Sequence, residues 1–245
     1  MPADERPSAT PHLSTPEWLA LLAEGDLEIE GQMPWSSNVT LLVRVRCDGL
    51  EARAIYKPGE GERSLWDFPP GLYRHEVAAY RLAEATALEV VPETVLRDGP
   101  LGEGSLQRFI DADFSQHYFS LLEEPAHHDA LRLVAGYDLL ANNADRKGGH
   151  FLLDRDGRIW GIDNGLCFHA QPKLRTVAWD FAGEPLPDAV IDACARLSGD
   201  LAPPLRALLT SRESRALTAR ARALLGHPVF PHPDLEEHCY PWPLV

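Results

Sequence analysis

Two acidic residues flank a segment that the sequence predicts to be a tight β-hairpin. Residues 151–162 contain two short strand-like runs, separated by the turn sequence DRDG at 154–157. A hairpin of this length brings its two ends together, so Asp145, His150 and Asp163 are expected to share one small volume. Such a cluster suits a divalent cation that binds phosphate oxygens, or a proton transfer. Any fold of this chain must therefore accommodate a polar site at the base of the hairpin.

The composition is that of an ordinary globular protein with a strong excess of acid. The 245 residues are 44% hydrophobic and 24% charged, which is enough for one large domain or two lobes. The 23 Lys and Arg residues against 37 Asp and Glu residues give a net charge of −14. This charge argues against a broad electrostatic surface for nucleic acid or for an anionic membrane. We therefore expect no nucleic-acid partner.

The sequence also predicts a cytoplasmic protein without integral membrane association. No apolar run approaches the roughly 20 residues that span a bilayer. The first residues lack the basic-then-apolar order of a signal peptide. The four cysteines are scattered without a CxxC pair, so neither a zinc site nor a disulfide framework is indicated.

The first half of the chain has the alternating pattern of β-strands. A tail and a short helix are predicted over 1–25, with Thr15 as the N-cap, and a β-rich lobe of about five strands over 26–110. Lys57 ends one of these strands, and Glu76 lies in a helix predicted over 72–82. Glu76 is either a solvated helix carboxylate or the partner of Lys57.

A polar loop between the first two strands is a candidate phosphate-binding element. It spans residues 31–38 and contains Ser36 and Ser37, whose hydroxyls and backbone N–H groups could cover phosphates. A plain hairpin loop is the alternative, and the residues alone favour it.

The second half of the chain is predicted to be helical. Apolar residues at helical spacing indicate helices over 116–123, 128–142, 187–197, 203–210 and 211–225. A β-rich half followed by a helical half implies an α+β fold, with an N-lobe over 26–110 and a helical C-lobe over 111–245. The cleft between the two lobes would hold the active site.

The residues around the hairpin resemble a known superfamily. The chain has NADRKGGH at 143–150 and IDNG at 162–165. With the strand-end lysine and the helix glutamate, these segments resemble the protein-kinase-like superfamily. Within it they are most similar to the atypical branch of phosphoinositide 3-/4-kinases and HipA-type kinases. That branch has the pattern Asn-x-Asp-Arg-x-x-x-Asn followed by Ile-Asp-(Asn/His)-(Gly/Ser). The likeness extends roughly over 27–225, is specific over 137–168, and is generic in the first half.

The resemblance implies a two-lobed protein-kinase-like fold and an ATP-dependent phosphotransferase. Lys57 would hold the α- and β-phosphates and be oriented by Glu76. Asp163 would bind Mg²⁺ or Mn²⁺, and Asp145 would orient and deprotonate the acceptor hydroxyl. Lys147 would reach the γ-phosphate.

The resemblance also implies a hinge, and it shows one departure from the family pattern. Residues 107–111 would read adenine through backbone hydrogen bonds, which makes Gln107 and Phe109 nucleotide-binding candidates. His150 stands where the family has an asparagine that binds a second metal ion. Neutral imidazole can also bind a metal, but it favours Zn or Mn over Mg. We therefore expect His150 to be a metal ligand in a site of reduced competence.

Several alternatives remain at this point. Asp145 and Asp163 could each be simple turn formers. The acceptor could be a protein hydroxyl or a small molecule; a phosphoinositide is less favoured because the chain is acidic and has no basic amphipathic helix. A pseudokinase that only binds nucleotide, and a nucleotidyl transferase on the same fold, are also open. Arg146 is expected to pair with a carboxylate for structural reasons, and Asp138 to brace the loop.

Overall fold

The first half of the chain forms an antiparallel sheet covered by one helix. The computed structural model describes residues 13–34, 38–234 and 238–245, so Ser36 and Ser37 lie outside the described residues. Helix α1 (Thr15–Glu24) precedes a five-stranded sheet with the order β1-β2-β3-β5-β4. The strands are β1 (Asp26–Gln32), β2 (Leu41–Cys47), β3 (Leu50–Pro58), β4 (Thr94–Gly99) and β5 (Gly102–Arg108). Every neighbouring pair is antiparallel. The pairs β1–β2, β2–β3 and β4–β5 are consecutive in the chain, whereas α2 and β4 separate β3 from its neighbour β5.

Helix α1 is held against the sheet by its apolar face. Trp18, Leu21 and Leu22 are buried, and they form one core with alternate residues of the central strands. The helix begins one residue earlier than predicted, with Ser14 as the N-cap. The backbone N–H and the hydroxyl of Ser14 both donate to the Glu17 carboxylate, at 2.8 and 2.5 Å, which satisfies the backbone N–H of the N-cap residue.

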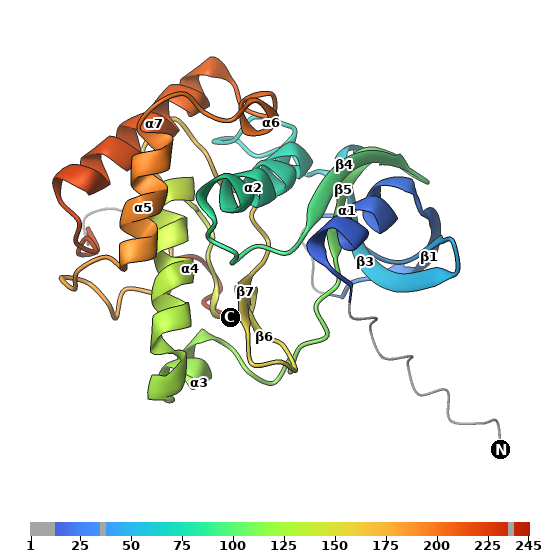
Figure 1. The fold of residues 1–245 in the computed structure, drawn as a ribbon, viewed down its shortest axis with the longest axis horizontal. Coiled ribbons are helices and arrows are strands. Elements are labelled where there is room, and N and C mark those ends of the chain that lie inside the picture. Colours follow the sequence, from blue (N-terminus) through green and yellow to red (C-terminus); the bar gives the residue numbers. More distant parts are fainter. Residues whose placement is uncertain (1–12, 35–37, 235–237) are drawn as a thin grey trace.

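The second half is mainly helical, and Figure 1 shows it beside the sheet with α2 between the two parts. Its helices are α3 (Tyr118–Leu122), α4 (His128–Ala141), α5 (Asp188–Leu197), α6 (Pro203–Arg206) and α7 (Ser211–Gly226). Helix α2 (Leu72–Thr86) comes from the first half, but its buried residues from Ala78 to Ala83 join the core of α4, α5 and α7. The predicted lobe boundary at residue 110 stays a prediction.

The predicted hairpin is confirmed. Strands β6 (Phe151–Leu153) and β7 (Ile159–Gly161) pair antiparallel, and Phe151 lies opposite Gly161. The 3-10 turn η3 (Gly148–His150) leads into β6. Pairing of the two strands brings the segments before and after the hairpin together. The hairpin also packs on α4, near the centre of the molecule (Figure 1).

Two predicted elements differ from the structure. The strand expected from Val90 begins only at Thr94, because the carbonyl of Val90 accepts a hydrogen bond from Gly161 N–H (2.7 Å) instead of joining the sheet. The helix expected over 203–210 ends at Arg206. Among the described residues, no helix combines the length and the apolar character needed to cross a bilayer.

We expect Gly136→Ala to destabilise the packing of α4 against α5. A Cβ atom at Gly136 would lie 2.5 Å from Val190 Cγ2, so the helices would have to separate. Overpacking of this kind costs about 1–3 kcal/mol. Gly226→Ala is the matched control, since a Cβ there meets nothing within 4 Å. Chemical denaturation of both variants tests this; equal stability would show that the α4–α5 contact can relax.

Candidate active site

Three elements bring a lysine and two carboxylates together. Lys57, at the end of β3, donates to Oε1 of Glu76 on α2, and its Nζ lies 2.8 Å from Oδ1 of Asp163, which follows β7. Glu76 is buried, whereas the Asp163 side chain is 49% exposed. The pairing of Lys57 with Glu76 is thus confirmed, and Asp163 is the most exposed member of the cluster.

The charges in this cluster stabilise one another. Burial alone would lower the pKa of Lys57, but the carboxylates of Asp163 and Glu76 raise it above its ordinary value. The charge of Lys57 in turn lowers the pKa of Asp163 well below its usual range. The lysine is therefore cationic and Asp163 anionic at neutral pH, as a site for phosphate and metal requires.

The backbone conformation after β7 and the buried contacts of Asn164 fix the position of Asp163. This residue has φ of +58°, in the left-handed region that Asp and Asn tolerate better than most residues. The next residue, Asn164, is buried: its N–H donates to Glu76 Oε2 at 2.9 Å and its side-chain amide donates to the Gly161 carbonyl at 3.1 Å. Glu76 therefore holds both Lys57 and the backbone that carries Asp163.

The loop before the hairpin carries the second carboxylate. The N–H of Asp145 donates to Asn143 Oδ1 at 2.9 Å, and Asp145 Oδ2 lies 3.0 Å from Lys147 Nζ. Burial raises the pKa of Asp145, Lys147 partly offsets this rise, and the charge of Asp163 adds to it. The environment therefore makes Asp145 a stronger base than an exposed aspartate.

Arg146 connects the Asp145 loop to the Asp163 loop through buried hydrogen bonds. Its guanidinium is fully buried and binds both oxygens of Asp138 at 2.8 Å, and it donates to Asn164 Oδ1 at 2.7 Å. It also donates to the carbonyl of Ile162. The predicted structural roles of Arg146 and Asp138 are confirmed, since this network ties α4, the Asp145 loop and the Asp163 loop together.

His150 lies between the two loops. Its Nε2 is 3.3 Å from Asp163 Oδ2, and its Nδ1 accepts a hydrogen bond from the N–H of Lys147 at 3.4 Å. Burial lowers the pKa of His150 to about 4, against the opposing effect of Asp163. The ring is thus neutral at pH 7. The structure brings His150, Asp163 and Asp145 together, as the hairpin predicted.

The predicted hinge residues lie at the end of β5. Gln107 is paired with Ile55 of β3 on one side and Thr94 of β4 on the other, and its side-chain amide donates to Thr94 Oγ1 at 2.9 Å. The N–H of Phe109 donates to the carbonyl of Arg53 at 3.2 Å. Adenine binding by Gln107 and Phe109 stays a prediction.

One pair of buried residues near the site was missed by sequence reasoning. His75, adjacent to Glu76 on α2, donates from Nδ1 to the carbonyl of Gly165 at 3.2 Å, and its Nε2 lies 3.3 Å from Glu213 Oε1. Burial would raise the pKa of Glu213, but hydrogen bonds from His75 and Thr210 lower it to about 2. The Thr-x-x-Glu capping box that begins α7 was the available signal for Glu213, although nothing in it indicates His75.

The end of the described chain covers the outer side of the Asp145 loop. The N–H of Gly148 donates to the carbonyl of Leu244 at 2.7 Å, and that of Thr176 to the carbonyl of Cys239 at 3.1 Å. The Thr176 segment also pairs with Arg146 in a parallel bridge. Residues 238–245 therefore support the Asp145 loop in two ways: directly, through the bond to Gly148, and indirectly, through the Thr176 segment that pairs with Arg146.

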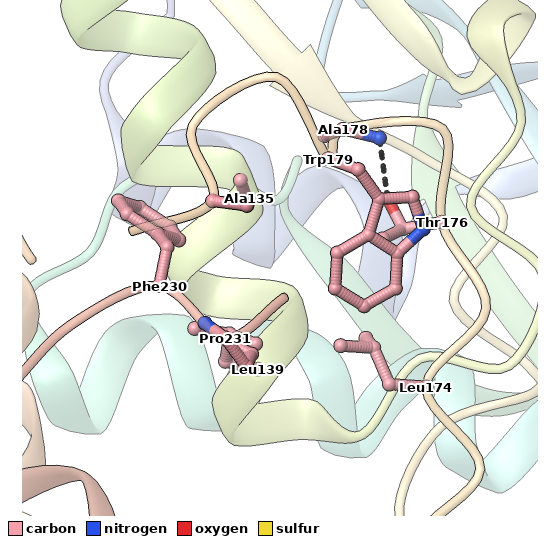
Figure 2. A pocket seen from close by; sticks show the side chains of 9 residues that line it. Ala135, Leu139, Leu174, Thr176, Ala178, Trp179, Phe230 and Pro231 are labelled. Atoms are coloured by element: carbon pink, nitrogen blue, oxygen red, sulfur yellow. Dashed lines mark hydrogen bonds between the residues drawn. The ribbon is translucent and has the colours of Figure 1, made fainter. Parts of the chain in front are cut away.

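A small apolar pocket lies apart from the charged cluster (Figure 2). It is formed by side chains of α4, the segment 174–182 and the stretch before residue 232. Its lining residues are Ala135, Leu139, Leu174, Thr176, Ala178, Trp179, Ala182, Phe230 and Pro231. None of the predicted catalytic, nucleotide-binding or metal-binding residues lines this pocket. Its lining has no ionisable side chain, so the candidate active site is the charged cluster of Lys57, Glu76 and Asp163.

The carboxylates fit a divalent cation in part. Within residues 13–34, 38–234 and 238–245, no group of three or more His, Cys, Asp or Glu side chains could hold a metal ion. Asp163 offers an accessible anionic oxygen of the kind that Mg²⁺ and Mn²⁺ prefer. A cation at Asp163 would thus take its remaining ligands from water and from the phosphates of a nucleotide, which is the usual arrangement for Mg²⁺.

Comparison with solved structures supports the fold class. Hydra Fam20, solved with a sugar, aligns with a TM-score of 0.55 and 12% identity over 86% of this chain and 87% of that one. The Helicobacter pylori proinflammatory kinase CtkA aligns with a TM-score of 0.47 and 13% identity, over 85% and 94% of the two chains. The α+β, protein-kinase-like fold predicted from the sequence, with its β-rich first half and helical second half, is confirmed by the elements of the structure and by the alignment with Fam20.

Comparison with other sequences identifies a relative. No protein-family model matches the chain. Protein Rv2133c of Mycobacterium tuberculosis (strain ATCC 25618 / H37Rv) is 38% identical over an alignment 262 residues long, which covers 91% of this chain and 94% of that protein. With this identity over nearly the whole of both chains, the protein described here belongs to the family of Rv2133c.

Proposed function

We propose that this protein is an ATP-dependent phosphotransferase that transfers the γ-phosphate of ATP to a hydroxyl group. The observation that carries the proposal is the position of Lys57, which contacts both the buried Glu76 and the accessible Asp163. A lysine held in this way is positioned to bind the phosphates of a nucleotide. The protein-kinase-like fold, in which such a lysine stands at the end of a strand above a cleft, supports this assignment.

The residues on the two sides of the hairpin take separate roles in this proposal. Asp163 would hold a Mg²⁺ or Mn²⁺ ion, which when bound neutralises charge on the transferring phosphoryl group. Asp145 would orient the acceptor hydroxyl and accept its proton, a role that its raised pKa favours. Lys147, 3.0 Å from Asp145, would stabilise the charge of the γ-phosphate. Gln107 and Phe109 would bind the adenine, and Ser36 and Ser37, which lie outside the described residues, remain the candidates for binding the phosphates.

The finer assignment rests on the sequence pattern. The NADR and IDNG segments resemble those of phosphoinositide 3-/4-kinases and HipA-type kinases. We infer a protein hydroxyl or a small molecule as the acceptor, because a net charge of −14 disfavours binding to an anionic lipid surface. A cytoplasmic enzyme with access to ATP is consistent with this function.

Incubation with labelled ATP tests the proposal. We expect label from [γ-³²P]ATP, but not from [α-³²P]ATP, to move to protein or to added acceptors in the presence of Mg²⁺ or Mn²⁺. Asp145→Asn should slow this transfer by about a hundredfold or more, since it removes the proton acceptor. Asp129→Asn is the matched control, because Asp129 is a fully exposed carboxylate on α4.

The same experiment separates the alternatives. Transfer of the α-label would indicate nucleotidyl transfer on the same fold. ATP binding in a thermal-shift titration without movement of either label would indicate a pseudokinase, which His150 in the asparagine position favours. If ATP does not bind at all, the proposed function is wrong.

A further inference from the structure

The two ring nitrogens of His150 have different surroundings. Nδ1 accepts a hydrogen bond from the backbone N–H of Lys147, at 3.4 Å. Nε2 lies 3.3 Å from Oδ2 of Asp163. A neutral imidazole has one N–H donor and one acceptor nitrogen. Because Nδ1 is the acceptor, the proton of the neutral ring lies on Nε2, next to the carboxylate of Asp163.

This arrangement does not fit a metal ligand. A ring nitrogen binds a metal ion through its lone pair, so the nitrogen cannot carry a proton at the same time. Binding through Nε2 would move the proton of His150 to Nδ1, where it would face the N–H of Lys147. Binding through Nδ1 would displace that same N–H. The ring would therefore have to give up its contact with the loop in order to bind a cation.

Cationic side chains already pair with both acidic loops beside the ring. Lys147, whose backbone N–H donates to Nδ1 of His150, has its Nζ 3.0 Å from Oδ2 of Asp145. Lys57 Nζ lies 2.8 Å from Oδ1 of Asp163, the residue that His150 contacts. A second divalent cation at His150 would therefore lie close to these two ammonium groups and be repelled by them.

We propose that His150 is a positioning residue for Asp163 and that the site operates with one divalent cation. This inference rests on the proposed function. His150 contacts Oδ2 of Asp163 while Lys57 contacts Oδ1, so the carboxylate is held from both sides. A carboxylate has about four lone-pair sites, so one cation can still bind to Asp163. The asparagine of the family pattern would provide an oxygen ligand there; the histidine of this chain provides a hydrogen-bond donor.

The tautomer of His150 can be measured in the nucleotide-free protein. Long-range ¹H–¹⁵N correlation spectra at pH 7, assigned with His150→Gln, are expected to show a protonated Nε2 and an unprotonated Nδ1. A protonated Nδ1 with a free Nε2 would overturn the assignment of His150 as a donor to Asp163. This measurement does not depend on catalysis, so it tests the role of His150 even if the proposed function is wrong.

The number of cations can be measured in the intact protein by Mn²⁺ titration. With a non-hydrolysable ATP analogue, electron paramagnetic resonance is expected to show one bound Mn²⁺ per chain, lost in Asp163→Asn. His150→Asn is expected to bind a second Mn²⁺, and His227→Asn, a change at an exposed residue, only one. Two Mn²⁺ ions in the unmodified protein, one of which is lost in His150→Gln, would overturn the single-cation proposal. If the analogue itself does not bind, it is the phosphotransferase function that fails, and the tautomer decides the role of His150.

Discussion

Asp163→Asn is expected to reduce transfer of the γ-phosphate by about a hundredfold to a thousandfold, the usual cost of removing one group that stabilises charge in a transition state. The substitution removes the negative charge that would hold the cation, while the side chain keeps nearly the same shape. Asparagine is a better choice than alanine because the residue has φ of +58°, which asparagine tolerates. The effect is measured as the rate of label transfer from [γ-³²P]ATP at saturating metal.

Asp163→Asn is expected to fold normally, so a loss of transfer would report on cation binding and not on unfolding. Lys57 keeps Glu76 as its partner, so no buried cation is left unpaired. Asp156→Asn, in the exposed turn of the β6–β7 hairpin, is the matched control and should transfer phosphate at the normal rate. Activity of Asp163→Asn within a factor of two of the unmodified protein would contradict the metal-binding role of Asp163.

Arg146→Met is expected to lower the free energy of unfolding by about 3–5 kcal/mol, as found when one partner of a buried ion pair is removed. The side chains of Arg146 and Asp138 are 0% and 1% exposed, so the substitution leaves a buried carboxylate without its cation. Asn164 Oδ1 and the carbonyl of Ile162 also lose a donor. For a chain of this length, the loss corresponds to a fall in Tm of roughly 6–20 °C.

A surface pair provides the control for this prediction. Arg155, whose side chain is 72% exposed, lies 2.9 Å from Asp111. Arg155→Met should change the stability by less than about 1 kcal/mol. Replacing both buried partners, with Arg146→Met and Asp138→Leu together, should recover part of the loss, because no unpaired charge remains. A Tm of Arg146→Met within 2 °C of the unmodified protein would show that the network does not support the fold.

The parts of the site that the sequence predicted are those in which a local pattern determines a long-range contact. The turn at 154–157 ensures that the hairpin closes, and closure alone brings Asp145 and His150 to Asp163. The contact of Lys57 with Glu76 has no such local cause. The sequence left Glu76 either solvated or paired with Lys57, and the resemblance to the kinase-like superfamily implied the pair. The structure shows the two side chains in contact.

The parts that the sequence could not predict depend on packing between distant elements. His75 looks like any histidine in a helix, and its role becomes visible only when α7 places Glu213 against it. The strand character of Val90 is overridden by its hydrogen bond to the hairpin, a contact that no periodicity encodes. The tautomer of His150 likewise follows from the position of a backbone N–H, which only coordinates reveal.

The pair formed by His75 and Glu213 has a consequence for the order in which the protein is assembled. Ribosomes synthesise a chain from its N-terminus to its C-terminus, so the sheet, α2 and both acidic loops emerge before α7. His75 also donates to the carbonyl of Gly165, two residues after Asp163. Until α7 docks, the ring that makes this contact lacks its carboxylate partner, Glu213. A nascent chain that ends before residue 213 would therefore hold all the reactive groups of the site but not this support. The proposed phosphotransferase activity would accordingly develop late in synthesis, after α7 has packed against α4 and α5.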